Sequence, residues 1–217
     1  MLDFTLLIEH WDQYRSGFRN TVAASVLALI GSFIIGVIFA VLRIAPSRLL
    51  NFVGSAYIEF VRNIPLILIV FIFYNGLPIL GINWNGFVSG TIGLTVYTSA
   101  FIAEAIRAGI LAVPKGQMEA ARSSGLSYLQ TMQHIILPQA MKIVIPPLGN
   151  QFLNLIKNSS VLGVIAGLDL MYFGDLINSD TFQTFSVYIF VGMFYLVLTI
   201  PMSIAVNALE RRMARSG

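Results

Sequence analysis

Long stretches without a charged residue divide this chain into apolar segments. The first, Thr21–Leu42, has 22 residues, close to the roughly 20 apolar residues with which a helix crosses a bilayer. The second, Asn63–Ala103, has 41 residues and is long enough for two spans. Its middle, residues 75–86, is rich in Asn, Gly, Pro and Trp, which is typical of a turn at a membrane surface. We therefore predict spans near 57–75 and 88–110.

Two further segments complete the apolar pattern. Residues 136–168 are apolar but interrupted by Pro146-Pro147, Lys157 and Gly163, and Thr181–Leu209 offers 29 uncharged residues, enough to cross with a tilt. Residues 1–17 mix apolar and charged side chains and predict an interfacial helix, whose acidic residues argue against a cleaved signal peptide. The pattern predicts an all-α membrane protein with five transmembrane helices in a single domain, residues 1–217.

The composition agrees with a membrane location. Apolar residues make up 57% of the chain and charged residues 11%, with a mean hydropathy of +0.81, whereas soluble domains carry about 25% charged residues. The 13 Lys and Arg residues form no basic stripe, which argues against nucleic-acid binding. Without Cys there are no disulfides or Cys-based zinc sites, and His10 and His134 are predicted on opposite sides of the membrane, so we expect no metal site.

The charges between the spans predict the orientation. Basic residues dominate the loops after the first and third spans and the C-terminal tail: Arg43, Arg48, Arg107, Lys115, Arg122, Arg211, Arg212 and Arg215. The loop after the fourth span carries Asp169, Asp175 and Asp180 and no basic residue. Under the positive-inside rule, the basic loops and the C-terminus are cytoplasmic, and the N-terminus with its interfacial helix lies outside. Arg15 and Arg19 are the only residues that contradict this orientation, and three nearby acids offset their charge.

The loop between the third and fourth spans, residues 114–138, has a helical pattern of its own. Pro114 can begin a helix that good helix formers continue until Gly125 ends it. Ser127 is suited to cap a second helix, and Pro138 stands where the chain re-enters the membrane. We predict two short helices around a glycine turn on the cytoplasmic face, with outward residues available to a soluble partner.

A motif in this loop resembles that of a known family. Glu119-Ala120-Ala121, followed after three intervening residues by Gly125 and after nine more by Ile135 and then Leu137-Pro138, is similar to the EAA loop of ABC importer membrane subunits. EFVRNIPLIL (59–68), SAFIAEAIRAGI (99–110) and GNQFLNLIKNSSVLGVI (149–165) resemble the permeases of polar amino-acid importers, the histidine/glutamine permease group.

The resemblance implies a type I ABC importer permease in the bacterial cell membrane. It implies several partners: a second permease chain, identical or paralogous, two ATP-binding cassette subunits and an extracytoplasmic solute-binding protein. This chain has no G-x-x-x-x-G-K-[ST] phosphate loop. We therefore expect that it is not an enzyme and holds no cofactor, and that a partner subunit binds and hydrolyses ATP.

The resemblance also assigns a role to the loop, which would insert as a coupling helix into a groove of the ATP-binding subunit. Glu119, Ala120, Ala121 and Gly125 match the motif. Alanine would permit close approach, glycine the sharp turn, and the glutamate would offer a partner for a basic group. The alternative is an ordinary surface helix built of good helix formers.

Lys157 is the candidate residue for binding the substrate, because a charge inside a span is costly and is a candidate for function. Lys157 also has no acidic neighbour in the sequence. Asn150, Asn154 and Lys157 fall on one helical face, with Gln151 and Asn158 beside it. Ser159 and Ser160 continue the polarity, while Pro146-Pro147 and Gly149 are expected to break the helix before it. The Lys157 ammonium would bind a substrate carboxylate, and the amides and hydroxyls its other polar atoms. Alternatively, Lys157 pairs with an acid of another helix or snorkels to the interface.

Other polar residues in the spans leave two interpretations open. Thr95, Tyr97, Thr98 and Ser99 form a second polar cluster on the third span, and they either join the site or bond their own backbone or a neighbouring helix. Glu59 and Arg62 stand three residues apart and could form a pair that is structural or that takes part in gating. Glu104 and Arg107 have the same spacing and could form a pair that is structural or that transmits movement to the adjacent loop.

The substrate class follows from the missing acids. Relatives that carry cationic amino acids tend to have acids where this chain has Gln151 and Asn158. A cationic substrate would therefore lack a counter-charge, and we expect an uncharged or acidic polar amino acid such as glutamine, glutamate or aspartate. The alternative function, an ion-coupled secondary transporter or channel subunit, would need intramembrane carboxylates that the central spans lack. A scaffold without transport activity is disfavoured by the polar stripe through the fourth span.

Overall fold

The computed structural model describes residues 2–214, and this part of the chain consists of helices and short connections without any strand. The all-α prediction is therefore confirmed for these residues, and Arg215 lies outside them. The segments η1 and η3 are π-helices, and η2 and η4 are 3-10 helices. In chain order the elements are α1 (Thr5–Glu9), α2 (Trp11–Ile44), α3 (Arg48–Arg62), α4 (Leu66–Phe71), η1 (Ile72–Gly76), η2 (Leu77–Leu80), α5 (Gly86–Leu111), α6 (Lys115–Ser123), α7 (Tyr128–Thr131), η3 (Met132–Ile136), α8 (Leu137–Asn158), η4 (Ser159–Ile165), α9 (Leu170–Thr181) and α10 (Thr184–Ala214).

Three helices of the described part, α2, α5 and α10, are each long and apolar enough to cross a membrane. Two further segments reach this length only as bent pairs: α3 with Leu66–Leu80, bent by 103°, and Tyr128–Ile165 with α9, bent by 48°. By length and composition, residues 2–214 thus contain three to five spans. The third and fifth predicted spans correspond to α5 and α10.

The N-terminal segment differs from its prediction as one interfacial helix over residues 1–17. Only α1 is separate, and from Trp11 onward the chain already belongs to α2, which continues to Ile44. The cause is packing at this end of the molecule. Tyr14 is fully buried, and its ring stacks on Phe194 of α10 at 5.5 Å between centroids. This packing extends α2 beyond the apolar stretch.

The second predicted span, near 57–75, is not one helix. The chain leaves helical geometry between Arg62 and Leu66, and the two parts meet at the sharp bend. Pro65 explains the break, because proline lacks an N–H group and disfavours helical geometry in the residue before it.

The expected break at Pro146-Pro147 is wrong. Both prolines lie inside α8, which runs without interruption from Leu137 to Asn158. Prolines are tolerated in membrane helices where neighbouring groups satisfy the freed backbone. The helix instead changes at η4, after which Ala166 and Leu168 adopt left-handed backbone conformations with φ of 53° and 57°. Such conformations cost about 1–3 kcal/mol each, so this link is held by its surroundings.

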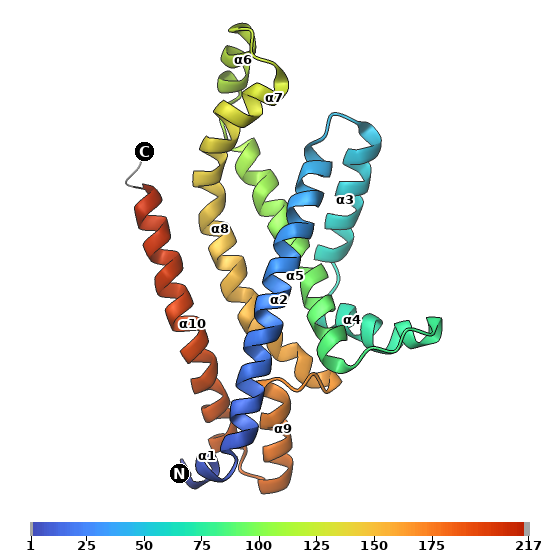
Figure 1. Cartoon of the computed structure of the whole chain (residues 1–217), viewed down its shortest axis with the longest axis vertical. Coiled ribbons are helices and arrows are strands. Elements are labelled where there is room, and N and C mark those ends of the chain that lie inside the picture. Colours follow the sequence, from blue (N-terminus) through green and yellow to red (C-terminus); the bar gives the residue numbers. More distant parts are fainter. Residues whose placement is uncertain (1, 215–217) are drawn as a thin grey trace.

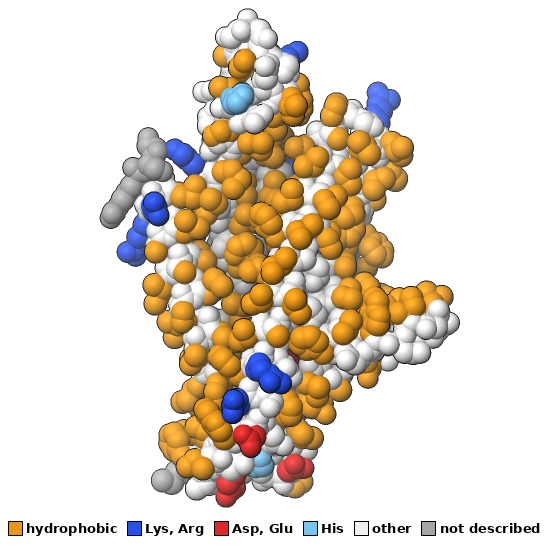
Figure 2. All heavy atoms as spheres, in the orientation of Figure 1, with side chains coloured by type: hydrophobic (Ala, Val, Ile, Leu, Met, Phe, Trp, Pro, Cys, Tyr) orange, Lys and Arg blue, Asp and Glu red, His pale blue; other side chains and the backbone are white. Residues whose placement is uncertain are grey.

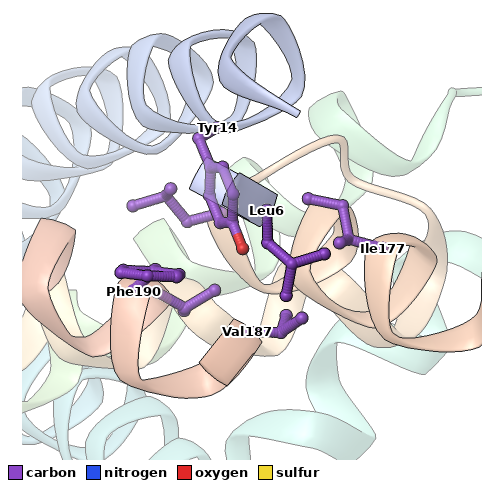
Figure 3. Packing of buried hydrophobic residues seen from close by; sticks show 7 residues of the cluster. Leu6, Tyr14, Ile177, Val187 and Phe190 are labelled. Atoms are coloured by element: carbon purple, nitrogen blue, oxygen red, sulfur yellow. The ribbon is translucent and has the colours of Figure 1, made fainter. Parts of the chain in front are cut away.

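The two ends of the molecule carry different elements (Figure 1): α6 and α7 lie at one end, and α1 and α9 lie at the other. A buried apolar cluster joins α1, α2, α9 and α10 at the second end. Figure 3 shows Tyr14 among Leu6, Ile177, Val187 and Phe190. The C-terminal end of α10 lies toward the α6 end.

Close helix packing places α5 at the centre. The face of α2 toward the bundle carries small residues every fourth position, Ala28, Ser32, Gly36 and Ala40, all buried, and such stripes let membrane helices approach closely. At the start of α5, a Cβ on Gly86 would lie 2.0 Å from the carbonyl oxygen of Ile165. Only glycine fits there, so the end of η4 is held directly against α5.

Candidate functional site

The predicted loop between α5 and α8 is a helix–turn–helix at one end of the molecule (Figure 1). Helix α6 begins after Pro114, and Gly125 ends it with φ of +86°. The Gly125 N–H donates to the carbonyl oxygen of Arg122 at 3.1 Å, and the Leu126 N–H donates to that of Ala121 at 3.2 Å. This pair of bonds is the Schellman motif, in which a left-handed residue satisfies the last helical carbonyls.

The second arm is fixed by side chains. The Gln130 N–H donates to Ser127 Oγ at 3.2 Å, and the Ser127 N–H donates to Gln130 Oε1 at 2.8 Å, forming a capping box. Arg122 Nη1 crosses the turn and donates to the carbonyl oxygen of Leu126 at 2.7 Å. Hydrogen bonds on both sides of Gly125 therefore make the two arms one stiff unit.

The four motif residues do not all face outward. Glu119, Ala120 and Gly125 are exposed, whereas Ala121 is 7% exposed and faces the rest of the chain. The small size of Ala121 therefore serves the packing of the loop on itself, while Glu119 and Ala120 form the free surface of α6.

A hollow of about 340 Å³ opens beside this surface. Its walls are largely apolar, and Lys115, Glu119 and Tyr128 stand among them. Sequence reasoning missed this hollow because five elements, α2, α5, α6, α7 and η3, contribute to its lining. The lining residues are Ile44, Ile110, Leu111, Val113, Pro114, Lys115, Met118, Glu119, Tyr128, Met132 and Ile136.

The loop is continuous with α8. After α7 the chain passes through the π-helical segment η3 into α8 without leaving helical geometry. The apolar residues Val113, Met132, Ile136 and Ala140 form one buried cluster that joins the end of α5 to this junction. A displacement of the loop would therefore be carried along α8.

A charge cluster of Arg43, Glu59, Arg62, Glu104 and Arg107 joins α2, α3 and α5. Glu104 is its centre: its carboxylate accepts from Arg107 Nε and Nη2 at 2.9 and 2.7 Å and from Arg43 Nη1 at 3.0 Å. Arg62 Nη1 lies 3.8 Å from the same carboxylate. The predicted Glu104–Arg107 pair is thus confirmed.

The predicted pairing of Glu59 with Arg62 is wrong. Glu59 Oε1 instead accepts from Arg43 Nη2 at 2.7 Å, and Arg62 turns to Glu104 and to the ring of Phe101, 5.5 Å from its guanidinium. Arg43 reaches both acids because it stands at the end of α2 between α3 and α5. Helix spacing alone could not reveal an arginine from another helix.

Lys157 lies on an exposed face of α8 together with Asn150 and Asn154, as the spacing predicts. Gln151, Asn158 and Ser160 are partly buried beside this face. Lys157 makes no ion pair with any acid of residues 2–214, so pairing within the described chain does not occur. It borders a hollow of about 290 Å³ against α10, where Thr199 and Ser203 add hydroxyl groups.

The remaining candidates point in several directions. Ser159 is fully buried and donates to the carbonyl oxygen of Ile156 at 2.8 Å. Thr95 donates to the carbonyl oxygen of Thr91 at 2.7 Å, and Tyr97 is partly buried near Phe101. Thr98 is buried one turn before Ile102, which packs on α8.

Ser99 bonds within α5 and to α3. Its hydroxyl lies 2.6 Å from the Tyr57 hydroxyl and donates to the carbonyl oxygen of Val96 at 2.8 Å. Of the predicted third-span cluster, Thr98 is thus on the α8 side of α5, while Thr95 and Ser99 use their hydroxyls within α5 and toward α3.

Asp169 is a structural residue that the sequence showed only as one of three loop acids. It is fully buried and caps α9, accepting from the N–H groups of Met171 and Tyr172 at 3.2 and 3.1 Å. Nearby, Thr21 Oγ1 accepts from the Leu170 N–H at 3.0 Å. An Asp directly before an apolar helical stretch is a known N-cap signal, and it could have been found.

Comparisons with known proteins agree with this architecture. Residues 32–215 match the family described as "Binding-protein-dependent transport system inner membrane component". The chain is 63% identical to the probable glutamine ABC transporter permease protein GlnM of Bacillus subtilis, over 99% of this chain and all of that protein. It is 36% identical to the probable glutamine ABC transporter permease protein GlnP of the same organism, over 93% of this chain and 92% of that one.

A solved structure has the same fold. The crystal structure of an amino acid ABC transporter with histidines contains a chain that is 36% identical and superposes with a TM-score of 0.91, covering 98% of this chain and 99% of that chain. The chain therefore belongs to the family of inner membrane components of binding-protein-dependent transport systems.

Proposed function

We propose that this chain is the transmembrane subunit of an ATP-driven ABC importer that moves a polar amino acid, uncharged or acidic, into the cytoplasm by alternating access. The observation that carries the proposal is the stiff helix–turn–helix that continues through η3 into α8, the helix that bears Lys157. This connection offers a mechanical path from a partner at the loop to a site in the membrane. The relatives named as glutamine ABC permeases support the substrate class.

The orientation in this proposal puts α6 and α7 in the cytoplasm and the N-terminus outside, with five spans if each bent pair counts as one. The distribution of charge supports it. Lys115 and Arg122 belong to the loop at one end of the molecule, whereas Asp175 and Asp180 belong to α9 at the other.

The substrate site in this proposal lies on the exposed face of α8. The Lys157 ammonium would bind the substrate carboxylate, because it is exposed and no acid of the described chain neutralises it. Asn154, Gln151, Asn158 and Ser160 would take up the other polar atoms. Thr98 is buried and Tyr97 packs near α3 and α4, so neither lies on this exposed face. Ser159 and Thr95 would affect the site only by fixing the local backbone, because their hydroxyls already donate to backbone carbonyl oxygens.

The working assembly would contain a second permease chain, two ATP-binding cassette subunits and an extracytoplasmic solute-binding protein. The ATP-binding subunits would clamp the free surface formed by Glu119 and Ala120, with Gly125 and Ala121 holding the loop in its form. ATP binding would turn the two permease halves outward, and hydrolysis would return them.

The test is uptake in proteoliposomes that contain this chain, its ATP-binding subunits and its binding protein. We expect that the uptake of radiolabelled glutamine requires ATP. Unlabelled glutamine should compete with it, whereas lysine and arginine should leave it unaffected. Strong competition by lysine would overturn the substrate class. Uptake driven by a proton or sodium gradient without ATP would instead support an ion-coupled transporter.

A further inference from the structure

Two arginines near the start of α2, Arg15 and Arg19, have no role in the transport proposal. Both are exposed, and neither forms an ion pair with any acid of residues 2–214. They also stand at the end of the molecule where basic residues are not expected. Figure 2 shows basic side chains over the lower part of α2, with acidic ones nearer the end of the molecule.

The arginines begin a stripe along α2. Arg15, Arg19, Val22, Val26 and Leu29 are separated by four, three, four and three residues, a spacing that keeps side chains on one helical face. The stripe is basic at its end and apolar along the rest. A phospholipid has the matching arrangement, with a phosphate headgroup followed by apolar acyl chains.

Two hollows follow this stripe and meet at Val22. The first, about 530 Å³, is lined by Asp12, Arg15, Ser16, Phe18, Arg19 and Val22. The second, about 150 Å³, starts at Val22 and runs between α2, α8 and α10, where apolar side chains including Leu29, Leu155 and Met202 form its walls. A polar basin thus continues into an apolar slot.

The length of the stripe corresponds to one leaflet. Ten residues separate Arg19 from Leu29, which is about 15 Å of helix at 1.5 Å per residue. This is half of the hydrocarbon core of about 30 Å. With the arginines at headgroup level, the apolar slot ends near the bilayer centre.

We propose that these two hollows form a binding site for one anionic phospholipid of the leaflet at the α1 end, which is the outer leaflet in the orientation proposed above. Arg15 and Arg19 hold the headgroup phosphate, and one acyl chain fills the slot between α2, α8 and α10. Asp12 reduces the charge of the basin to a single net positive charge, which matches a singly charged headgroup such as phosphatidylglycerol. The site is independent of which amino acid is carried.

Native mass spectrometry of the purified transporter complex that contains this chain, with added phosphatidylglycerol or phosphatidylcholine, tests this site. We expect one phosphatidylglycerol to stay bound per chain and phosphatidylcholine to be lost. The double variant Arg15→Gln/Arg19→Gln should weaken retention by about twenty-five-fold, the product of about fivefold for each arginine at a membrane surface. The charge-matched control is Arg211→Gln/Arg212→Gln at the other end of the molecule, which should retain the lipid.

A second pair of variants separates the slot from simple charge attraction. Val26→Trp fills the slot and should displace the lipid although both arginines remain, whereas Val41→Trp, on the same helix and similarly exposed (56% against 49%), should not. The proposal is overturned if both lipids bind alike, if the arginine double variant retains phosphatidylglycerol, or if Val26→Trp has no effect. It is also overturned if the arginine variant loses affinity for the solute-binding protein and not for the lipid.

Discussion

Gly125 offers a direct test of the coupling loop, because its left-handed backbone connects the two arms. A Cβ placed there would meet no atom within 4 Å, so substitutions act through the backbone and not through steric contact. Asn tolerates φ of +86° well, and Gly125→Asn should be nearly neutral. Gly125→Ala should cost about 1 kcal/mol, the lower end of the cost of a left-handed non-glycine residue.

Gly125→Pro is the decisive variant. Proline fixes φ near −65° and has no N–H, so both the turn and the 3.1 Å bond to the Arg122 carbonyl oxygen are lost, at a local cost of about 3 kcal/mol or more. Because the site lies at the tip of an exposed loop, the membrane-embedded helices should still fold. We expect the Pro variant to assemble and allow ATP hydrolysis, while uptake in proteoliposomes falls to background.

The assay compares ATP hydrolysis and uptake in the same preparation, with thermal unfolding as a check on folding. Gly116→Ala is the matched control, since a Cβ there also meets no atom within 4 Å and the residue has ordinary helical geometry. Uptake should follow the order Gly, Asn, Ala, Pro. Normal uptake by Gly125→Pro would refute the idea that a rigid turn transmits the push.

Three further changes probe other parts of the molecule. Glu104→Gln removes the acid at the centre of the charge cluster and should lower the free energy of unfolding by about 1–2 kcal/mol. This loss is smaller than for a fully buried acid because the Glu104 side chain is 21% exposed. Arg62→Gln should have a smaller effect in the same thermal unfolding measurement, because Arg62 Nη1 is 3.8 Å from the Glu104 carboxylate. Lys157→Gln should leave the unfolding temperature unchanged, because the side chain is exposed. It should reduce uptake by tenfold or more without altering the affinity of the binding protein for the substrate. Unchanged uptake would show that Lys157 is not part of the site. Asp169→Ala removes the N-cap of α9 and should cost about 1–2 kcal/mol, whereas Asp169→Asn keeps an acceptor and should cost less; equal losses would show that the charge, not the cap, matters.

Features set by neighbouring residues along the chain could be predicted from the sequence. The span predicted near 88–110 corresponds to Gly86–Leu111, because a long apolar stretch in a membrane has few alternatives to a helix. The helix–turn–helix between α5 and α8 could be predicted in the same way, since Pro114, Gly125 and Ser127 each act within one turn of the helix they begin or end.

Features set by other helices could not be predicted. Pro65 and the pair Pro146-Pro147 carry the same local signal, yet only the first breaks its helix. The pairing of Glu59 illustrates the same limit. Its partner Arg43 stands 16 residues away on another helix and takes the place of Arg62, the predicted partner three residues away. The sequence also gives no sign of the hollow beside Glu119, whose walls come from five elements.

The exposed polar face of α8 carries a consequence for assembly. A lysine at the centre of a membrane helix costs about 2.5–3.5 kcal/mol, and Asn150 and Asn154 share the exposed face of Lys157. Facing lipid, these three side chains would find no partners for their polar atoms. Within the described chain, Lys157 has a shallow hollow against α10 but no counter-charge. The face is therefore stable in a membrane only against water, substrate or a second helical bundle, and the proposed path enclosed by two permease chains would provide all three.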